Sequence, residues 1–265
     1  MNVRVSFEVF PPKTDAGLHG LHTAVKALEA LDPVYVSVTY GAGGGQRDKS
    51  FAAIDTVRTA AADTPVAAHL TCVGQSRAEI GAILDRYAEL GVRHVVALRG
   101  DPPDGIDAPY SAHPDGFQTT AELVAAIRDR GEFRIAVSAY PEPHPQSPSA
   151  AHDLDVLAAK VAAGADLAMT QMFFDNDLYL RYRDQVTARG IAVPIVPGVF
   201  PIHSFEAVAR FAARCGASMP ATLADAFAAV ADDAAAGTEL AADLAALQVA
   251  QLAAEGVEHV HLYTL

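Results

Sequence analysis

Cysteine and basic side chains are scarce in this sequence of 265 residues. Cys72 and Cys215 are the only cysteines, which are too few for a disulfide framework or a cysteine metal cluster, and we expect both to be buried apolar residues. Lys and Arg number 19 against 32 Asp and Glu, so the net charge is −13. This balance argues against nucleic acid or an anionic membrane as the main partner, because both require a basic face. An anionic small ligand remains compatible if local cations or helix N-termini bind it.

Long apolar runs and a secretory signal are also missing. No segment is long enough and free enough of charge to span a bilayer, and the opening MNVRVSFEVF lacks a charged n-region followed by an apolar h-region. The cytoplasm is therefore the expected compartment. With 51% hydrophobic and 19% charged residues, the chain is expected to fold as one compact domain over 1–265, without a regulatory domain.

Short β-rich segments alternate with Ala/Leu-rich helical segments along the whole chain. The predicted strands are 3–8, 34–39, 66–71, 94–99, 134–140, 167–173, 193–199 and 257–264. The predicted helices are 16–30, 47–61, 76–90, 117–129, 149–163, 176–189, 204–214 and a pair within 221–253. Eight such units are typical of a (β/α)8 TIM barrel. A doubly wound open sheet is the alternative, but no G-x-G-x-x-G follows the first strand.

Signals at the helix ends support this division. Ser147-Pro148 predicts an N-cap followed by proline at the first helical position, and SRAE at 76–79 has the spacing of a capping box. The glycines in ELGV (89–92) and AGAD (163–166) predict helix stops before the next strand.

Polar side chains fall at the predicted C-terminal ends of seven of the eight strands, where TIM barrels carry their active sites. One such residue would usually be a satisfied polar group, but their repetition predicts a ring of polar groups around one mouth of the barrel. The ring comprises Glu8, Thr39, Tyr40, His69, Thr71, Arg99, Asp101, Tyr140, Glu142, His144, Gln171 and Tyr263.

Several reaction classes lack their residues. No strand end supplies a Lys for Schiff-base chemistry, there is no G-x-S-x-G elbow, and the glycine-rich loop GAGGGQRD (41–48) lacks the Gly-Lys-Ser/Thr ending of a P-loop. His259 and His261 have the spacing of a metal pair, but a pair in the barrel wall is the favoured interpretation. Acid–base chemistry by Glu8 and Asp101, beside aromatic and amide groups that suit a planar ligand, is what remains.

Eight motifs occur in the order seen in another group of proteins. They are SFEVFPPK, VSVTYGAGGGQRD, HLTC, HVVALRGDPP, AYPEPHP, TQMFFD, VPGVFPI and HLYTL. Together they resemble the methylenetetrahydrofolate reductase family, with a match on nearly every strand. The resemblance implies a (β/α)8 barrel that uses FAD to move a hydride from NAD(P)H to 5,10-methylenetetrahydrofolate, yielding 5-methyltetrahydrofolate.

The resemblance also implies roles for the strand-end residues. Glu8 matches the general acid that opens the five-membered ring of the folate, a role for which a raised pKa is expected. Asp101 matches a carboxylate beside flavin and folate, whose charge stabilises the cationic iminium. Gln171 and Tyr263 match substrate-side positions, and Phe205 resembles the aromatic residue that stacks on folate or nicotinamide.

Further positions match those that bind FAD in the family. They are Thr39, His69, Leu98, Arg99, Gly100, Asp101, Tyr110, Tyr140, His144, Asp153 and Lys160. Arg99 and Lys160 are cations able to meet a pyrophosphate. Asp153 and Lys160 are seven residues apart and so share a helix face, where they can serve one extended ligand.

Two alternatives remain open at this stage. One is a reductase of the same fold and substrate without flavin, in which hydride passes directly from nicotinamide to folate; the unusual loop GGGQRDKS leaves room for it. The other is a non-catalytic flavin- or folate-binding barrel. The lack of an evident Arg cluster for a 2′-phosphate favours NADH over NADPH. A homo-oligomer is compatible with the sequence, and relatives generally continue past YTL with Asn-Arg, whose Arg is expected near the folate.

Overall fold

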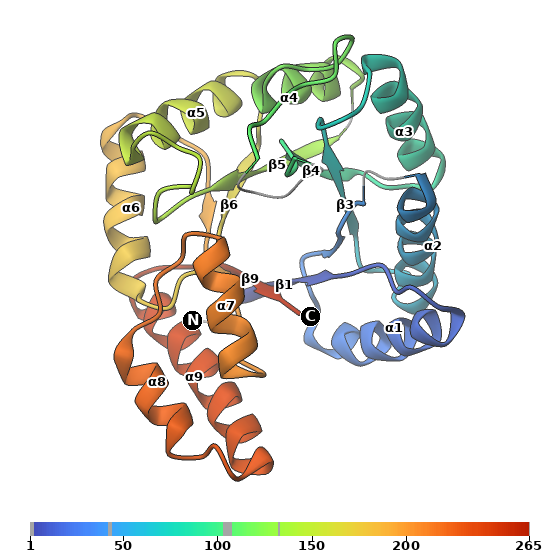
Figure 1. Ribbon diagram of the computed structural model, residues 1–265. Coiled ribbons are helices and arrows are strands. Elements are labelled where there is room, and N and C mark those ends of the chain that lie inside the picture. Colours follow the sequence, from blue (N-terminus) through green and yellow to red (C-terminus); the bar gives the residue numbers. More distant parts are fainter. Residues whose placement is uncertain (1–2, 42–43, 103–107, 132, 265) are drawn as a thin grey trace.

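The chain forms a closed ring of parallel strands surrounded by helices (Figure 1). A computed structural model describes residues 3–41, 44–102, 108–131 and 133–264. Within these ranges the strands are β1 (Arg4–Val9), β2 (Val36–Val38), β3 (Val66–Thr71), β4 (His94–Leu98), β5 (Arg134–Ala139), β6 (Leu167–Thr170), β7 (Ile195–Val196), β8 (Gly198–Val199) and β9 (His259–Tyr263). All pairs of neighbouring strands are parallel.

The predicted seventh strand, 193–199, is divided in two and closes the barrel. β7 pairs with β6, whereas β8 pairs with β9, which in turn pairs with β1. The break falls at Pro197, which has no N–H for a ladder but whose carbonyl oxygen accepts from the backbone N–H of His261 at 2.9 Å. The predicted (β/α)8 barrel is therefore confirmed, with the broken strand turning from one neighbour to the other.

Helices follow the strands and cover the outside of the barrel (Figure 1). They are α1 (Asp15–Leu28), the short 3₁₀ helix η1 (Glu29–Leu31), α2 (Gly44–Ala60), α3 (Arg77–Glu89), α4 (Thr120–Asp129), α5 (Ala150–Ala162), α6 (Asn176–Ala188), α7 (Phe205–Arg214), α8 (Ala221–Ala228) and α9 (Ala234–Ala254). The pair predicted within 221–253 is confirmed. No helix among the described residues is long and apolar enough to cross a membrane.

The helix ends confirm one predicted cap and correct another. Ser76 and Glu79 form the reciprocal capping box of α3. The prediction that Ser147 caps α5 is wrong, because Ser149 is the N-cap and accepts from the backbone N–H of His152. Pro148 thus precedes the cap instead of occupying the first helical position. Gly91 and Gly164 end α3 and α5 with positive φ, as predicted.

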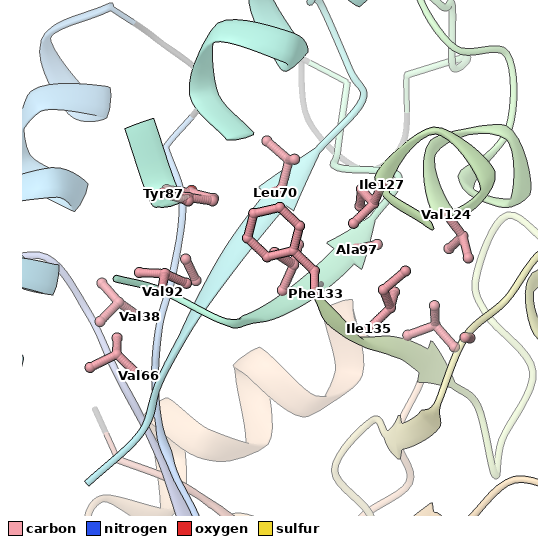
Figure 2. Close-up of a cluster of buried hydrophobic side chains, with 14 of the residues drawn as sticks. Val38, Val66, Leu70, Tyr87, Val92, Ala97, Val124, Ile127, Phe133 and Ile135 are labelled. Carbon is pink, nitrogen blue, oxygen red and sulfur yellow. The ribbon is translucent and has the colours of Figure 1, made fainter. Parts of the chain in front are cut away.

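Apolar side chains form two layers, one outside and one inside the ring of strands. The outer layer lies between the strands and the helices, and includes Leu70, Tyr87, Ile127 and Ile135 (Figure 2). The inner layer fills the barrel with side chains from successive strands: Tyr35, Ala67, Val96, Ala136, Met169 and Val196. These side chains form an apolar plug at mid-height of the barrel, and a cavity lies toward each of its two ends. Cys72 is buried as expected, whereas Cys215 is half-buried; both are free thiols.

Candidate active site

A cavity of about 330 Å³ opens at the C-terminal ends of the strands. We call it the mouth cavity. Many of the predicted site residues line it: Glu8, Thr39, His69, Leu98, Asp101, Tyr140, Gln171 and Tyr263. They come from β1, β3, β4, β9 and the loops that follow β2, β4, β5 and β6. Seven of the twelve residues of the predicted polar ring therefore share one cavity, whereas Tyr40, Thr71 and Glu142 line neither this cavity nor the one beside it.

A second cavity, of about 290 Å³, lies beside the first. We call it the side cavity. It is lined by six predicted flavin-binding residues, namely Arg99, Tyr110, Tyr140, His144, Asp153 and Lys160. Ser138 and Tyr140 line both cavities. The two cavities thus form adjoining compartments, which suits a ligand with two separate ends.

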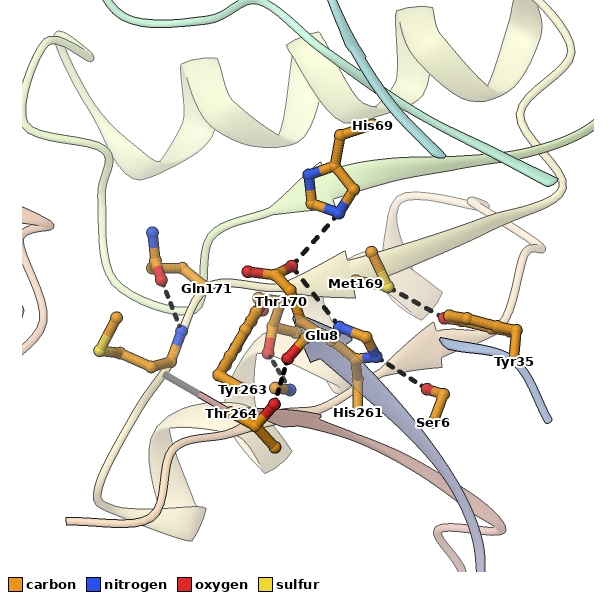
Figure 3. Close-up of polar contacts among 12 residues, drawn as sticks. Ser6, Glu8, Tyr35, His69, Met169, Thr170, Gln171, His261, Tyr263 and Thr264 are labelled. Atoms are coloured by element: carbon orange, nitrogen blue, oxygen red, sulfur yellow. Dashed lines mark hydrogen bonds and ion pairs between the residues drawn. The ribbon is translucent and has the colours of Figure 1, made fainter. Parts of the chain in front are cut away.

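Glu8 lines the mouth cavity, and the imidazole rings of His69 and His261 approach the same oxygen of its carboxylate (Figure 3). Glu8 is 8% exposed to solvent. Oε2 lies 3.3 Å from Nε2 of His69 on β3 and 3.7 Å from Nε2 of His261 on β9. Neither imidazole nitrogen has a hydrogen-bond partner of good geometry among the described residues. One oxygen of Glu8 therefore lies close to two imidazole nitrogens without a well-formed hydrogen bond to either.

This geometry corrects the expected ionisation of Glu8. Burial raises the pKa of the carboxyl group, but the charge of His69 and the close approach of the His261 and His69 ring nitrogens outweigh burial and lower the pKa to about 2. The raised pKa that the sequence suggested is therefore wrong for this arrangement. The sequence could not reveal it, because His69 and His261 come from strands far from β1 in the chain.

Tyr263 forms the wall of the mouth cavity beside Glu8. Its hydroxyl donates to the carbonyl oxygen of Thr170 at 2.6 Å, and burial together with the nearby Glu8 charge raises its pKa well above the usual value. Gly198 leaves room for this ring, since a Cβ there would lie 2.5 Å from Cε2 of Tyr263. Gln171 accepts from the backbone N–H of Met172 through Oε1, which leaves its amide NH₂ as a donor for a ligand.

Gly100 shapes the turn that presents Asp101, which is exposed at the rim of the mouth cavity. Its φ is +82°, and a Cβ would lie 2.5 Å from Cγ1 of Val73 and 2.9 Å from Cβ of Thr71. Gly100 itself lines neither cavity. Its flavin role thus stays a prediction, while its backbone role follows from the left-handed conformation and the close neighbours.

Replacing Gly100 by alanine is expected to lower the free energy of unfolding by clearly more than the roughly 1–2 kcal/mol that a left-handed conformation costs an L-residue. The added cost comes from the overlap with Val73 and Thr71. The matched control is Gly190→Ala, where φ is +74° and no atom lies within 4 Å of the new Cβ. Urea unfolding of both variants provides the measurement. Equal losses would show that the packing around Gly100 relaxes freely.

Two cations face the side cavity. Lys160 is 3% exposed, and its Nζ donates to the carbonyl oxygen of Ser138 at 2.7 Å. Burial lowers its pKa to about 8, although Asp153 opposes this effect. The guanidinium of Arg99 lies 4.8 Å from the ring centroid of Tyr110. Among the described residues, neither cation has a carboxylate within ion-pair distance.

Some side chains lie elsewhere than the sequence suggested, and others were missed. Phe205 lies outside both cavities and stacks on Phe227 at 5.5 Å, so its substrate role stays a prediction. The aromatic rings at the mouth, besides tyrosines, are Phe10, Phe200 and Phe211. His261 was noted only as a wall residue. The adjacency of the last and first strands of a barrel was the signal that could have placed it beside Glu8.

The fold and the site define a TIM-barrel protein with a charged mouth and an adjoining cationic cavity. The profile of the methylenetetrahydrofolate reductase family matches residues 1–265. The chain is 40% identical over 263 residues to the 5,10-methylenetetrahydrofolate reductase of Escherichia coli K12, covering 99% of this chain and 86% of that protein. It is 34% identical to methylenetetrahydrofolate reductase (NADH) 1 of Arabidopsis thaliana, covering 98% of this chain and 45% of that protein.

The chain therefore belongs to the methylenetetrahydrofolate reductase family, a family of oxidoreductases. Among solved structures, it resembles a Clostridium thermocellum protein that binds two copies of 5-methyl-5,6,7,8-tetrahydrofolic acid. The TM-score is 0.66 at 12% identity, covering 99% of this chain and 88% of that one. A likeness at this identity supports the barrel fold alone.

Proposed function

We propose that this chain reduces 5,10-methylenetetrahydrofolate to 5-methyltetrahydrofolate, with NADH or NADPH as the hydride donor and FAD as the bound cofactor. The observation that carries the proposal is the buried Glu8 carboxylate, which lines the mouth cavity and lies within 4 Å of the Nε2 atoms of His69 and His261, in a chain that belongs to this family. The name of the Arabidopsis relative specifies NADH, which supports a nicotinamide donor.

The described residues fit FAD. Lys160 is a buried cation with no carboxylate within ion-pair distance in the described part of the chain, an arrangement that favours an anionic ligand such as a pyrophosphate. Arg99 and Lys160 would hold the phosphates in the side cavity, and Tyr140 separates it from the mouth cavity, where Thr39 and Leu98 lie. When bound, FAD supplies hydride transfer from nicotinamide to folate.

The residues of the mouth cavity supply acid and charge. Glu8 passes a proton to the folate ring nitrogen whose bond to the methylene carbon breaks. Because its low pKa keeps the carboxyl group ionised at pH 7, Glu8 takes that proton from the ring N–H of His69 or His261 as the folate nitrogen accepts it. The negative charge of Asp101 stabilises the cationic iminium that accepts the hydride. Gln171 and Tyr263 bind the substrate through the amide and the ring.

The proposal is tested by the visible absorption of the purified protein before and after addition of NADH without oxygen. We expect a flavin spectrum that bleaches with NADH and recovers on addition of 5,10-methylenetetrahydrofolate. A colourless protein that cannot be reconstituted with FAD, yet oxidises NADH with the folate, would favour direct hydride transfer. A flavin that bleaches and does not recover would favour the non-catalytic barrel.

A further inference from the structure

A second polar region lies at the opposite, N-terminal end of the barrel. A cavity of about 460 Å³ opens there, and we call it the floor cavity. It is lined by His94 and His259, and by charged residues that include Arg4, Arg134 and Asp166. Val96 lines both the floor cavity and the mouth cavity, so only a thin layer of the inner core separates them.

A chain of hydrogen bonds crosses this layer beside the apolar plug. His259 Nε2 lies 2.9 Å from Ser6 Oγ, and Ser6 Oγ lies 2.8 Å from His261 Nδ1. The other nitrogen of His261, Nε2, faces Oε2 of Glu8 at 3.7 Å (Figure 3). The hydrogen bonds therefore lead from the floor cavity to His261, whose Nε2 lies 3.7 Å from the proposed acid.

Strand register produces this alignment. Ser6 and Glu8 on β1 are partners of His261 and Tyr263 on β9, and Arg4 is the partner of His259. Alternate residues of a strand face the same side, so Ser6 and Glu8 face the barrel interior together with His259 and His261. The Ser6 and His261 side chains are fully buried, whereas His259 is half-buried.

Ser6 and His259 can both donate and accept protons, which allows a proton to move along these hydrogen bonds from His259 to His261. The Ser6 hydroxyl has one proton and two imidazole neighbours, so it can donate to one ring only while accepting from the other. Burial, His261 and Arg4 lower the pKa of His259 to about 4. Its ring is thus neutral at pH 7, and a neutral imidazole carries one N–H to donate and one lone pair to accept a proton.

We propose that His259, Ser6 and His261 form a proton relay that supplies protons from the floor cavity to Glu8. Its role in catalysis rests on the proposed function, because hydride reduction of methylenetetrahydrofolate consumes one proton per turnover. His259 accepts a proton at Nδ1 from hydronium in the floor cavity, which leaves water, and releases one from Nε2 to Ser6 Oγ. Ser6 passes its own proton to His261 Nδ1, and His261 releases one from Nε2 to Glu8.

One proton therefore enters at the floor and one reaches Glu8, without any change in the number of protons on the relay. The ring tautomers and the hydroxyl orientation reset before the next turnover. Ligands that cover the mouth cavity leave this route open, which is its advantage over proton entry from the mouth.

The test compares two half-reactions by stopped-flow spectroscopy: reduction of the enzyme by NADH, and its reoxidation by 5,10-methylenetetrahydrofolate. We expect His259→Gly to slow reoxidation about 10-fold to 100-fold, since a positioned proton transfer is worth about 10²–10⁴ in rate. Reduction by NADH is expected to stay unchanged. Added imidazole, which can enter the floor cavity, is expected to restore reoxidation.

His94→Gly is the matched control, because His94 lines the same cavity and contacts the same Tyr35 ring as His259 but has no hydrogen bond to Ser6. We expect it to react at the wild-type rate. Ser6→Ala and His259→Gln interrupt the relay with smaller changes in packing, and they decide the test if His259→Gly does not fold. Wild-type reoxidation in the relay variants, or equal losses in both half-reactions, would overturn the relay. Loss without rescue by imidazole in a folded His259→Gly variant would also overturn it.

A separate measurement keeps this inference distinct from the proposed function. The ¹⁵N NMR spectrum of labelled histidines reports which ring nitrogen carries the proton, and Ser6→Ala is expected to shift the signals of both His259 and His261. Unchanged signals would refute the hydrogen-bonded chain. A wild-type protein that does not reduce methylenetetrahydrofolate would refute the proposed function and would leave the NMR result intact.

Discussion

Replacing Glu8 by glutamine is expected to lower the rate of methylenetetrahydrofolate reduction by about 10²–10⁴, the usual contribution of a positioned general acid. Glutamine keeps the size of the side chain but cannot release a proton to the folate nitrogen. Oxidation of NADH with an artificial quinone acceptor should remain close to the wild-type rate, because that reaction needs no acid at the folate. Steady-state rates with both acceptors are the measurement.

Glu142→Gln is the matched control for this substitution. Glu142 follows β5 and was expected in the polar ring, but it lines neither cavity and instead accepts from the backbone N–H of Ser218 at 3.0 Å. A glutamine amide oxygen can accept the same hydrogen bond, so folate reduction should be unchanged. Undiminished folate reduction in Glu8→Gln would remove Glu8 from the mechanism.

Lys160→Met is expected to have opposite effects on ligand binding and on stability. A hydrogen bond to a charged group contributes about 1.5–3 kcal/mol, so loss of the cation should raise the Kd for FAD by roughly 10-fold to 100-fold. The unfolding free energy of the ligand-free protein at pH 7 should rise, because methionine fills the buried site without the cost of desolvating a charge. Flavin titration and urea unfolding measure the two effects.

The pH dependence of stability provides a further check on Lys160. Its folded-state pKa of about 8 lies below the ordinary value of 10.5, so folding favours the neutral amine. The ligand-free protein should thus gain stability from this group as the pH rises from about 8 toward 10.5, and Lys160→Met should lose that gain. Lys26→Met, on the exposed face of α1, is the control for both measurements. Unchanged FAD affinity in Lys160→Met would show that Lys160 does not bind the phosphates.

Many features of this protein followed from local patterns in its sequence. Strand β3 was predicted with its observed limits, 66–71, and the other elements lie within a few residues of their predicted positions. The reason is that alternation of β-rich and helical segments, together with glycine at helix ends, acts over short stretches of chain. The barrel then follows from the number of units, and the strand-end position of Glu8 predicted its place at the mouth.

The tertiary structure alone decided what surrounds that carboxylate. His261 is 253 residues from Glu8 along the chain, and it becomes a neighbour because β9 pairs with β1 when the barrel closes. His69 on β3 and His261 on β9 together lower the pKa of Glu8, where burial by itself would have raised it. Closure of the barrel also aligns Ser6 with two imidazoles. Local sequence patterns determine whether a side chain of a strand points into the barrel or toward the helices. Contacts between strands that are distant in the sequence determine which side chains it meets, its ionisation and the paths that protons can follow.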